Sequence, residues 1–220
     1  MEIICEGSGL HRRLLVVFSL LSGCPKFGNQ GKKWLDLRAL SQALLPEHEV
    51  SRVRYYTARV GDTADDTSRA LRQDVYIRAL RTLPEVIITQ GEFVKTKREA
   101  ILAHPPTGIE PKQTVWIRQE KGSDVCLAMH LLMDALDSPG ELAVLLTNDS
   151  DFVEPIKIVR ERFYTTVRVI SPDIAISRKL RRVADSSQLF DQRLLERCQL
   201  PEIVIDADGR AIRRPAAWSL

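Results

Sequence analysis

Residues 142–152 read LAVLLTNDSDF, a continuous apolar run followed at once by a polar turn. Apolar runs of this length are typical of strands that are buried on both faces of a parallel sheet. The run predicts a strand over residues 142–147, and the pattern after the turn predicts a helix over residues 152–162. Ligands bind at the carboxyl edge of open parallel sheets, so we expect the functional site at this turn.

Strand and helix patterns alternate on both sides of this stretch. Three segments have apolar residues at helical spacing: residues 34–45, 65–83 and 122–136. Four are rich in β-branched and aromatic residues, which favour strands: residues 50–60, 85–93, 114–118 and 166–170. This alternation predicts an α/β fold, a three-layer α/β/α sandwich with a mostly parallel sheet.

Two further segments depart from the alternation. Residues 94–113 are rich in Lys, Pro and Gly and predict a protruding loop or ribbon, which we expect to face the substrate. Near the C-terminus the pattern predicts a short helix over residues 193–199 and a β-hairpin over residues 203–213 with Asp208-Gly209 at its centre. We therefore expect an atypical N-terminal segment (1–31), one globular domain (32–186) and a tail (187–220).

The composition sets the class of protein. The 220 residues are 44% hydrophobic, enough for one sizeable core. The 32 basic and 29 acidic residues give a net charge of +3, which permits a nucleic-acid partner without demanding one. Cys5, Cys24, Cys126 and Cys198 are scattered, so they predict neither a disulfide framework nor a structural zinc site but reduced thiols in a cytoplasm.

The N-terminus allows one alternative location. An apolar run over residues 14–21 lies between Arg12 and Cys24, which is similar to a bacterial lipoprotein signal with Cys24 as the lipidated residue. The run is short, however, and Glu2 is unusual before such a signal. We favour a buried first strand, and we expect a cytoplasmic protein without a membrane partner.

The turn after the buried strand contains two carboxylates. Asp149 and Asp151 can point into the same crevice, and clustered carboxylate oxygens suit a hard cation such as Mg²⁺ or Mn²⁺. Asp151 and Glu154 also have the spacing of a capping box, so the turn can equally be read as a helix cap.

A second polar junction, residues 121–125 (KGSDV), precedes another predicted helix. Asp124 is a candidate metal ligand, and Lys121 a candidate contact to phosphate or to the charge that builds on phosphorus during hydrolysis. Taken alone, the commoner explanation is that Ser123 caps the helix while Asp124 complements the helix dipole.

Together the two junctions favour a metal site over helix capping, because they resemble a known family. KGSDV, a helix, the strand LAVLLT and the turn NDSDF closely resemble the NYN domain family, relatives of the PIN ribonucleases. The resemblance extends through WLDL (34–37) and YYTARV (55–60) to CQLPEIVIDADGRAIRRPAAW (198–218), which is similar to the tail of stand-alone bacterial members. It covers roughly residues 32–218.

The resemblance implies a function and a set of site residues. It implies a metal-dependent RNA nuclease that hydrolyses phosphodiester bonds, with single-stranded RNA as partner and Mg²⁺ or Mn²⁺ as cofactor. Asp124, Asp149 and Asp151 correspond to metal-site and catalytic residues, Lys121 to a further catalytic residue, and Asn148 to a weaker candidate. The alternative is a non-catalytic RNA- or protein-binding module on the same fold.

Two departures from the family bear on activity. NYN domains open with a strand that ends in an Asp, usually read as IDGxNL, and residues 16–23 supply no Asp. Either the first strand has degenerated, or the reading frame is misassigned before about Phe27. His130 stands where the family often has an Asp. A neutral imidazole can serve as a metal ligand there, but a structural histidine is the commoner explanation.

Basic and aromatic residues offer candidate contacts to RNA. An RNA backbone could follow basic residues in two clusters, although a solvated helix face is the commoner explanation: Arg178, Lys179, Arg181 and Arg182, and Arg213 and Arg214. Tyr55, Tyr56 and Trp116 could stack on single-stranded bases, but aromatic residues of strands usually fill cores, so we expect all three in the core.

Overall fold

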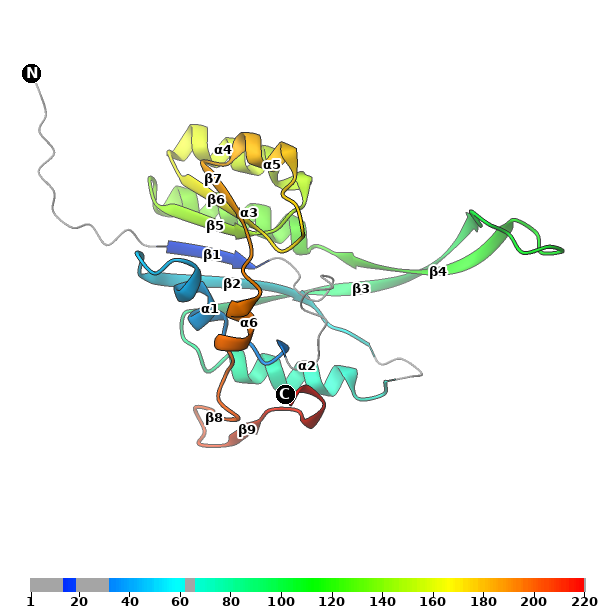
Figure 1. Ribbon diagram of the computed structural model, residues 1–220, viewed down its shortest axis with the longest axis horizontal. Coiled ribbons are helices and arrows are strands. Elements are labelled where there is room, and N and C mark those ends of the chain that lie inside the picture. Colours follow the sequence, from blue (N-terminus) through cyan, green and yellow to red (C-terminus); the bar gives the residue numbers. More distant parts are fainter. Residues whose placement is uncertain (1–13, 19–31, 62–65, 220) are drawn as a thin grey trace, which may run out of the picture.

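The computed structural model describes residues 14–18, 32–61 and 66–219. A seven-stranded sheet in the order β4-β3-β2-β1-β5-β6-β7 forms the middle layer (Figure 1). All neighbouring strands are parallel except β3 and β4. The strands are β1 (Leu14–Phe18), β2 (Val50–Ala58), β3 (Val86–Ile101), β4 (Lys112–Lys121), β5 (Leu142–Leu146), β6 (Thr166–Ser171) and β7 (Ser186–Leu189).

Helices cover both faces of the sheet, which confirms the predicted three-layer α/β/α sandwich (Figure 1). One layer contains α1 (Leu37–Leu44), α2 (Arg69–Leu80) and α6 (Arg193–Arg197). The other contains α3 (Ser123–Asp137), α4 (Val153–Phe163) and α5 (Arg178–Val183). Among the described residues no helix has the length and apolar character needed to cross a membrane.

The apolar run 142–146 forms β5 and divides its side chains between two cores. Leu142, Val144 and Leu146 pack in the cluster with α1 and α2, while Ala143 and Leu145 pack in the cluster with α3 and α4. All five residues are buried. The strand is therefore covered on both faces, as its unbroken apolar sequence predicts.

The strand order places a topological switch point between β1 and β5. β1 pairs with β2 on one side and with β5 on the other, and Phe18 is level with Leu146. The chain moves outward from β1 to β2 and β3, then returns to the opposite side of β1 as β5. Ligands of doubly wound sheets bind outside the carboxyl ends of the strands at such a point. Cys24 lies outside the described residues.

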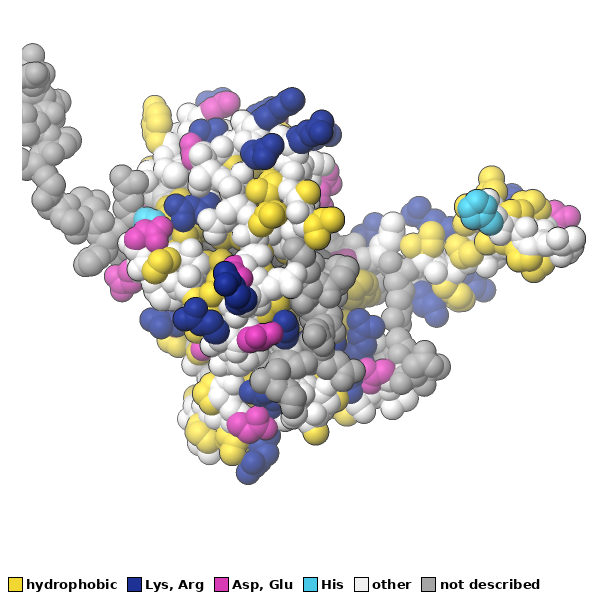
Figure 2. Space-filling model, viewed as in Figure 1, with side chains coloured by type: hydrophobic (Ala, Val, Ile, Leu, Met, Phe, Trp, Pro, Cys, Tyr) yellow, Lys and Arg dark blue, Asp and Glu magenta, His cyan; other side chains and the backbone are white. Residues whose placement is uncertain are grey.

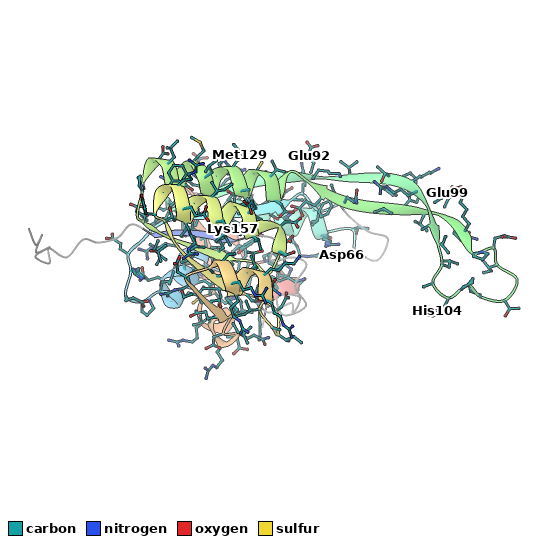
Figure 3. The ribbon with its side chains drawn as sticks, turned by 90° about the horizontal axis from the view of Figure 1, so that it is seen from above. Asp66, Glu92, Glu99, His104, Met129 and Lys157 are labelled. Atoms are coloured by element: carbon teal, nitrogen blue, oxygen red, sulfur yellow. The ribbon has the colours of Figure 1, made fainter. Side chains whose placement is uncertain are left out.

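The predicted excursion is a two-stranded antiparallel ribbon that projects from the carboxyl edge of the sheet (Figures 1 and 3). β3 continues past the predicted strand end at Phe93 to Ile101, because β4 supplies hydrogen-bonding partners from Lys112 onward. Gly91 lies where β3 leaves the sheet. A Cβ atom there would lie 2.7 Å from Ser123 Oγ and 3.0 Å from the Lys121 carbonyl oxygen, so only glycine allows this close approach.

The C-terminal segment packs into the core beneath α1 and α2. The predicted short helix and hairpin appear as α6, β8 (Ile203–Ile205) and β9 (Ala211–Arg213), followed by the 3₁₀ helix η5 (Ala216–Trp218). The rings of Trp218 and Tyr76 are 5.9 Å apart, and the rings of Trp218 and Trp34 are 6.5 Å apart. The tail therefore shares the core of the sandwich.

Candidate functional site

Three carboxylates lie near one another at the carboxyl edge of the sheet. Asp149 and Asp151 lie just beyond β5, at the 3₁₀ helix η4 (Ser150–Phe152), and Asp124 lies in the first turn of α3. Asp124 is an exposed residue, but partial burial of its carboxyl group disfavours the charged form and raises its pKa. The negative charges of Asp149 and Asp151 raise the pKa further. The fold thus brings together acidic residues that are separated by more than twenty positions in the sequence.

Asp149 also has a structural task. Its Oδ1 accepts a hydrogen bond of 2.9 Å from the backbone N–H of Asp151, which caps η4. The cap that the capping-box spacing assigned to Asp151 is therefore provided by Asp149, because a 3₁₀ turn intervenes before α4 begins.

The first turn of α3, which contains Asp124, has no side-chain cap. The N-cap residue of α3 is Gly122, which has a φ of 88° and no side-chain cap. Ser123 Oγ instead donates a hydrogen bond to the carboxylate of Glu120. The explanation in which Ser123 caps the helix is therefore wrong, whereas Asp124 does lie beside the positive end of the helix dipole.

Glu120 is a fourth carboxylate at this edge, which the sequence did not indicate. Partial burial raises the pKa of Glu120, and the charge of Asp124 raises it further against the effect of the hydrogen bond from Ser123. The predicted strand ended at Arg118. Only the antiparallel return of β4, which pairs Glu120 with Phe93, places this residue beside Asp124. Lys121, the last residue of β4, is exposed at the same edge.

The side chain of Asn148 joins β5 to the loop after β6. Its Nδ2 donates to Asp173 Oδ2 at 2.7 Å and to the carbonyl of Ala175 at 3.1 Å, while its Oδ1 accepts from the backbone N–H of Ser177 at 2.7 Å. These bonds hold the segment that leads into α5 against the acidic turn.

His130 lies further along α3. Its Nδ1 is 2.7 Å from the hydroxyl of Tyr56, a fully buried residue of β2. Partial burial lowers the pKa of His130, and the nearby charge of Arg54 lowers it further. Six helical residues separate His130 from Asp124, a rise of about 9 Å. These contacts favour the structural explanation for this histidine.

Basic side chains flank the acidic turn. The 3₁₀ helix that contains Asp151 packs against α5. Four residues of α5 are exposed, and none of them forms an ion pair within the described residues: Arg178, Lys179, Arg181 and Arg182. Figure 2 shows dark blue side chains gathered over this part of the molecule.

Of the second basic pair, Arg213 is exposed and Arg214 is paired with Glu202 at 3.2 Å.

The aromatic candidates separate into two environments. Tyr55 and Tyr56 are buried in the two cores, as expected. Trp116 lies on the ribbon and is 56% exposed, so the expectation that it fills the core is wrong. Trp116 lies on the part of β4 that projects beyond the sheet, where no layer of the sandwich covers it.

The acidic edge fits a hydrated hard cation in its donor chemistry. Its donors are carboxylate oxygens, which Mg²⁺ and Mn²⁺ prefer. A cation would relieve the repulsion by Asp149 and Asp151, which adds to the effect of burial on the pKa of Asp124. In the described part of the chain no three carboxylate, imidazole or thiolate groups are close enough to form a complete metal site. Mg²⁺ usually keeps several waters and uses one or two carboxylates together with phosphate oxygens.

The chain is similar to known proteins at the levels of family, sequence and structure. The family model described as NYN domain matches residues 22–191. The chain is 23% identical over 221 residues to 6-hydroxy-3-succinoylpyridine 3-monooxygenase HspA of Pseudomonas putida, covering 84% of this chain and 68% of that protein. A protein of unknown function from Vibrio parahaemolyticus has a similar fold, with a TM-score of 0.50, 16% identity, and coverage of 84% of this chain and 97% of that one.

Proposed function

Because the chain belongs to the NYN domain family, we propose that it is a metal-dependent ribonuclease that hydrolyses phosphodiester bonds in RNA. The observation that supports this proposal best is that Asp149 and Asp151, just beyond β5 at the switch point of the sheet, lie close enough to Asp124 for their charges to add to the rise in its pKa that burial causes. A PIN-like nuclease-type family and a carboxylate cluster at the ligand-binding edge point to the same chemistry.

Each residue of the edge has a proposed role. The carboxylates of Asp124, Asp149 and Asp151 would hold Mg²⁺ or Mn²⁺ together with water and the RNA phosphate. When bound, such an ion lowers the pKa of water and neutralises charge on the phosphate. Lys121 donates a hydrogen bond to a phosphate oxygen, where charge accumulates during hydrolysis. The exposed basic residues of α5 attract the RNA backbone.

The test is cleavage of end-labelled single-stranded RNA by the purified chain with Mg²⁺, with Mn²⁺ and with EDTA. Asp124→Asn removes a negative charge from the edge with almost no change in shape. Asp208→Asn is the matched control, because Asp208 lies exposed in the hairpin turn and asparagine suits that turn equally well. The proposal expects metal-dependent cleavage that is lost with Asp124→Asn and kept with Asp208→Asn.

The alternative function is a non-catalytic RNA- or protein-binding module. One observation favours it: β1 ends at Phe18 beside β5, and residues 16–23 contain no Asp to add to the acidic edge. If the chain cuts no RNA with either metal, while a version given an Asp-bearing first strand of the family type does, the binding module is correct for this chain.

A further inference from the structure

The outer part of the β3–β4 ribbon has an exposed tryptophan flanked by two lysines. Trp116 is 56% exposed, and the ammonium groups of Lys95 and Lys97 lie 4.3 and 5.0 Å from the centre of its ring. Both distances are within the range of a cation–π interaction. The three side chains therefore form one unit on the surface of the ribbon.

The register of the ribbon places this unit on a single face. Lys97 is directly opposite Trp116, and Lys95 is two residues along the same strand, so all three share one side of the pleat. Phe93, 40% exposed, is two residues further toward the sheet on that side. We refer to Phe93, Lys95, Lys97 and Trp116 as the ribbon face.

The charges of the ribbon face are not matched by carboxylates. Neither Lys95 nor Lys97 forms an ion pair within the described residues. Glu99, on the same side of the pleat, is instead paired with Lys112 at 2.6 Å. Two cations above an exposed indole have affinity for anions, and the indole offers a flat apolar surface.

The position of the ribbon relates this face to the acidic edge. The ribbon stands clear of the helical layers, with Glu92 at its root and His104 near its tip (Figure 3). Trp116 precedes Lys121 by five strand residues, a rise of about 17 Å. β4 therefore runs from the ribbon face directly to the edge where Asp124 and Asp149 lie.

We infer that the ribbon face binds single-stranded RNA on its way to the acidic edge, with one base stacked on Trp116 and phosphates bound by Lys95 and Lys97. Alternating aromatic and basic contacts suit single strands, because every unpaired base has a free π-face and every nucleotide carries a phosphate. A duplex hides its base faces and lacks the first contact. This inference rests on the proposed function for the choice of RNA.

The three tryptophans of the chain provide a direct measurement. Trp34 is 0% and Trp218 is 9% exposed, so a soluble quencher or a stacked base reaches Trp116 in preference to the other two. We would titrate the full chain with a mixed-sequence single-stranded RNA in EDTA, which prevents metal-dependent cleavage, and record tryptophan fluorescence and the anisotropy of labelled RNA. Duplex RNA of the same sequence is the comparison ligand.

The variants separate stacking from charge. Trp116→Ala is expected to weaken binding of single-stranded RNA about 5- to 100-fold, while Trp116→Phe keeps a π-face and recovers most of the affinity. Lys95→Gln with Lys97→Gln is expected to lower the slope of log affinity against log salt by about 0.7 for each lost phosphate contact. Tyr164→Asn is the matched control, because Tyr164 is an 80% exposed aromatic residue in a left-handed conformation that asparagine tolerates.

The expected result is quenching of Trp116 by single-stranded RNA, weaker binding by the ribbon variants and no change with Tyr164→Asn. The inference is overturned if RNA binds without quenching Trp116, if no RNA binds, or if the chain forms dimers that Trp116→Ala dissociates, since a second copy would then occupy the face. Quenching without cleavage in Mn²⁺ contradicts the nuclease but leaves the ribbon face standing. Cleavage in Mn²⁺ without quenching of Trp116 supports the nuclease but contradicts the binding of RNA at the ribbon face.

Discussion

Asp149 Oδ1 lies 2.9 Å from the backbone nitrogen of Asp151 and caps η4. The negative charge of the same carboxylate adds to the effect of burial in raising the pKa of Asp124. The two tasks are separable by substitution. Asp149→Asn keeps an acceptor for the cap but removes the charge, so we expect stability to change by less than about 0.5 kcal/mol while metal-dependent cleavage falls roughly 100-fold. Asp149→Ala should lose about 1 kcal/mol more. Urea denaturation and RNA cleavage measure the two effects, and equal activity of Asp149→Asn and the wild type would show that Asp149 is only a cap.

Gly91 determines how closely the root of the ribbon approaches α3. Gly91→Ala places a Cβ 2.7 Å from Ser123 Oγ, so the start of α3 or the end of β4 must shift. We expect destabilisation of about 1–3 kcal/mol, as for other overpacked sites, together with reduced cleavage because Lys121 and Asp124 move.

The matched experiment adds Ser123→Ala to Gly91→Ala. Removing the hydroxyl eliminates the closest contact, so the double variant should recover part of the lost stability in urea denaturation. A double variant no more stable than Gly91→Ala would mean that the contact with the Lys121 carbonyl, at 3.0 Å, is the one that matters.

An ion cluster around the buried carboxylate of Asp134 joins α3 to β2 away from the acidic edge. Asp134 is 8% exposed and accepts hydrogen bonds from Arg52 at 2.5 Å and from Arg54 at 2.6 Å. The hydrogen bond with Asp134 is the main cause of the raised pKa of Arg54. Asp134→Ala leaves the mostly buried Arg54 side chain without its carboxylate, so we expect a loss of about 3–5 kcal/mol. Glu161→Ala, which removes an exposed carboxylate from α4, is the control for urea denaturation.

Asp185 should make stability depend on pH in acid. Partial burial alone would raise its pKa, but hydrogen bonds from Arg160 and from the backbone N–H of Val167 outweigh burial and lower the pKa. A lowered folded-state pKa contributes stability above the unfolded pKa of about 4, and this contribution is lost as pH falls through the folded value.

The comparison is between the wild type and Asp185→Asn, with thermal unfolding followed from pH 7 to pH 3. We expect the wild type to be more stable by about 1 kcal/mol at pH 7, a modest value because the pair is about one-third exposed. The difference should begin to shrink as pH falls toward about 4 and should continue to shrink toward the lower folded-state pKa. A difference that is as large at pH 3 as at pH 7 would attribute the effect to shape and not to charge.

Local patterns were sufficient for most of the fold. The apolar run 142–146 is buried on both faces, and its sequence shows this directly because neither face has a polar residue. The sequence after Phe93 did not distinguish a loop from a ribbon, because residues that face solvent on both sides of a strand have no apolar periodicity. The environment of Trp116 was mistaken for the same reason: a strand aromatic in the sheet and one beyond its edge have the same local sequence.

By itself the sequence determined the layers, the parallel sheet and the edge at which Asp149 and Asp151 lie, because apolar periodicity specifies which faces are buried and carboxyl ends of parallel strands share an edge. Only the tertiary structure decided that Glu120 joins Asp124, that Asp149 provides the cap, and that Trp116 stands exposed beneath two lysines. Each of these depends on the register of β3 and β4 or on the geometry of a turn. The register of two paired strands and the geometry of a turn depend on how the chain is placed in the whole fold, which residue spacing along one segment does not specify.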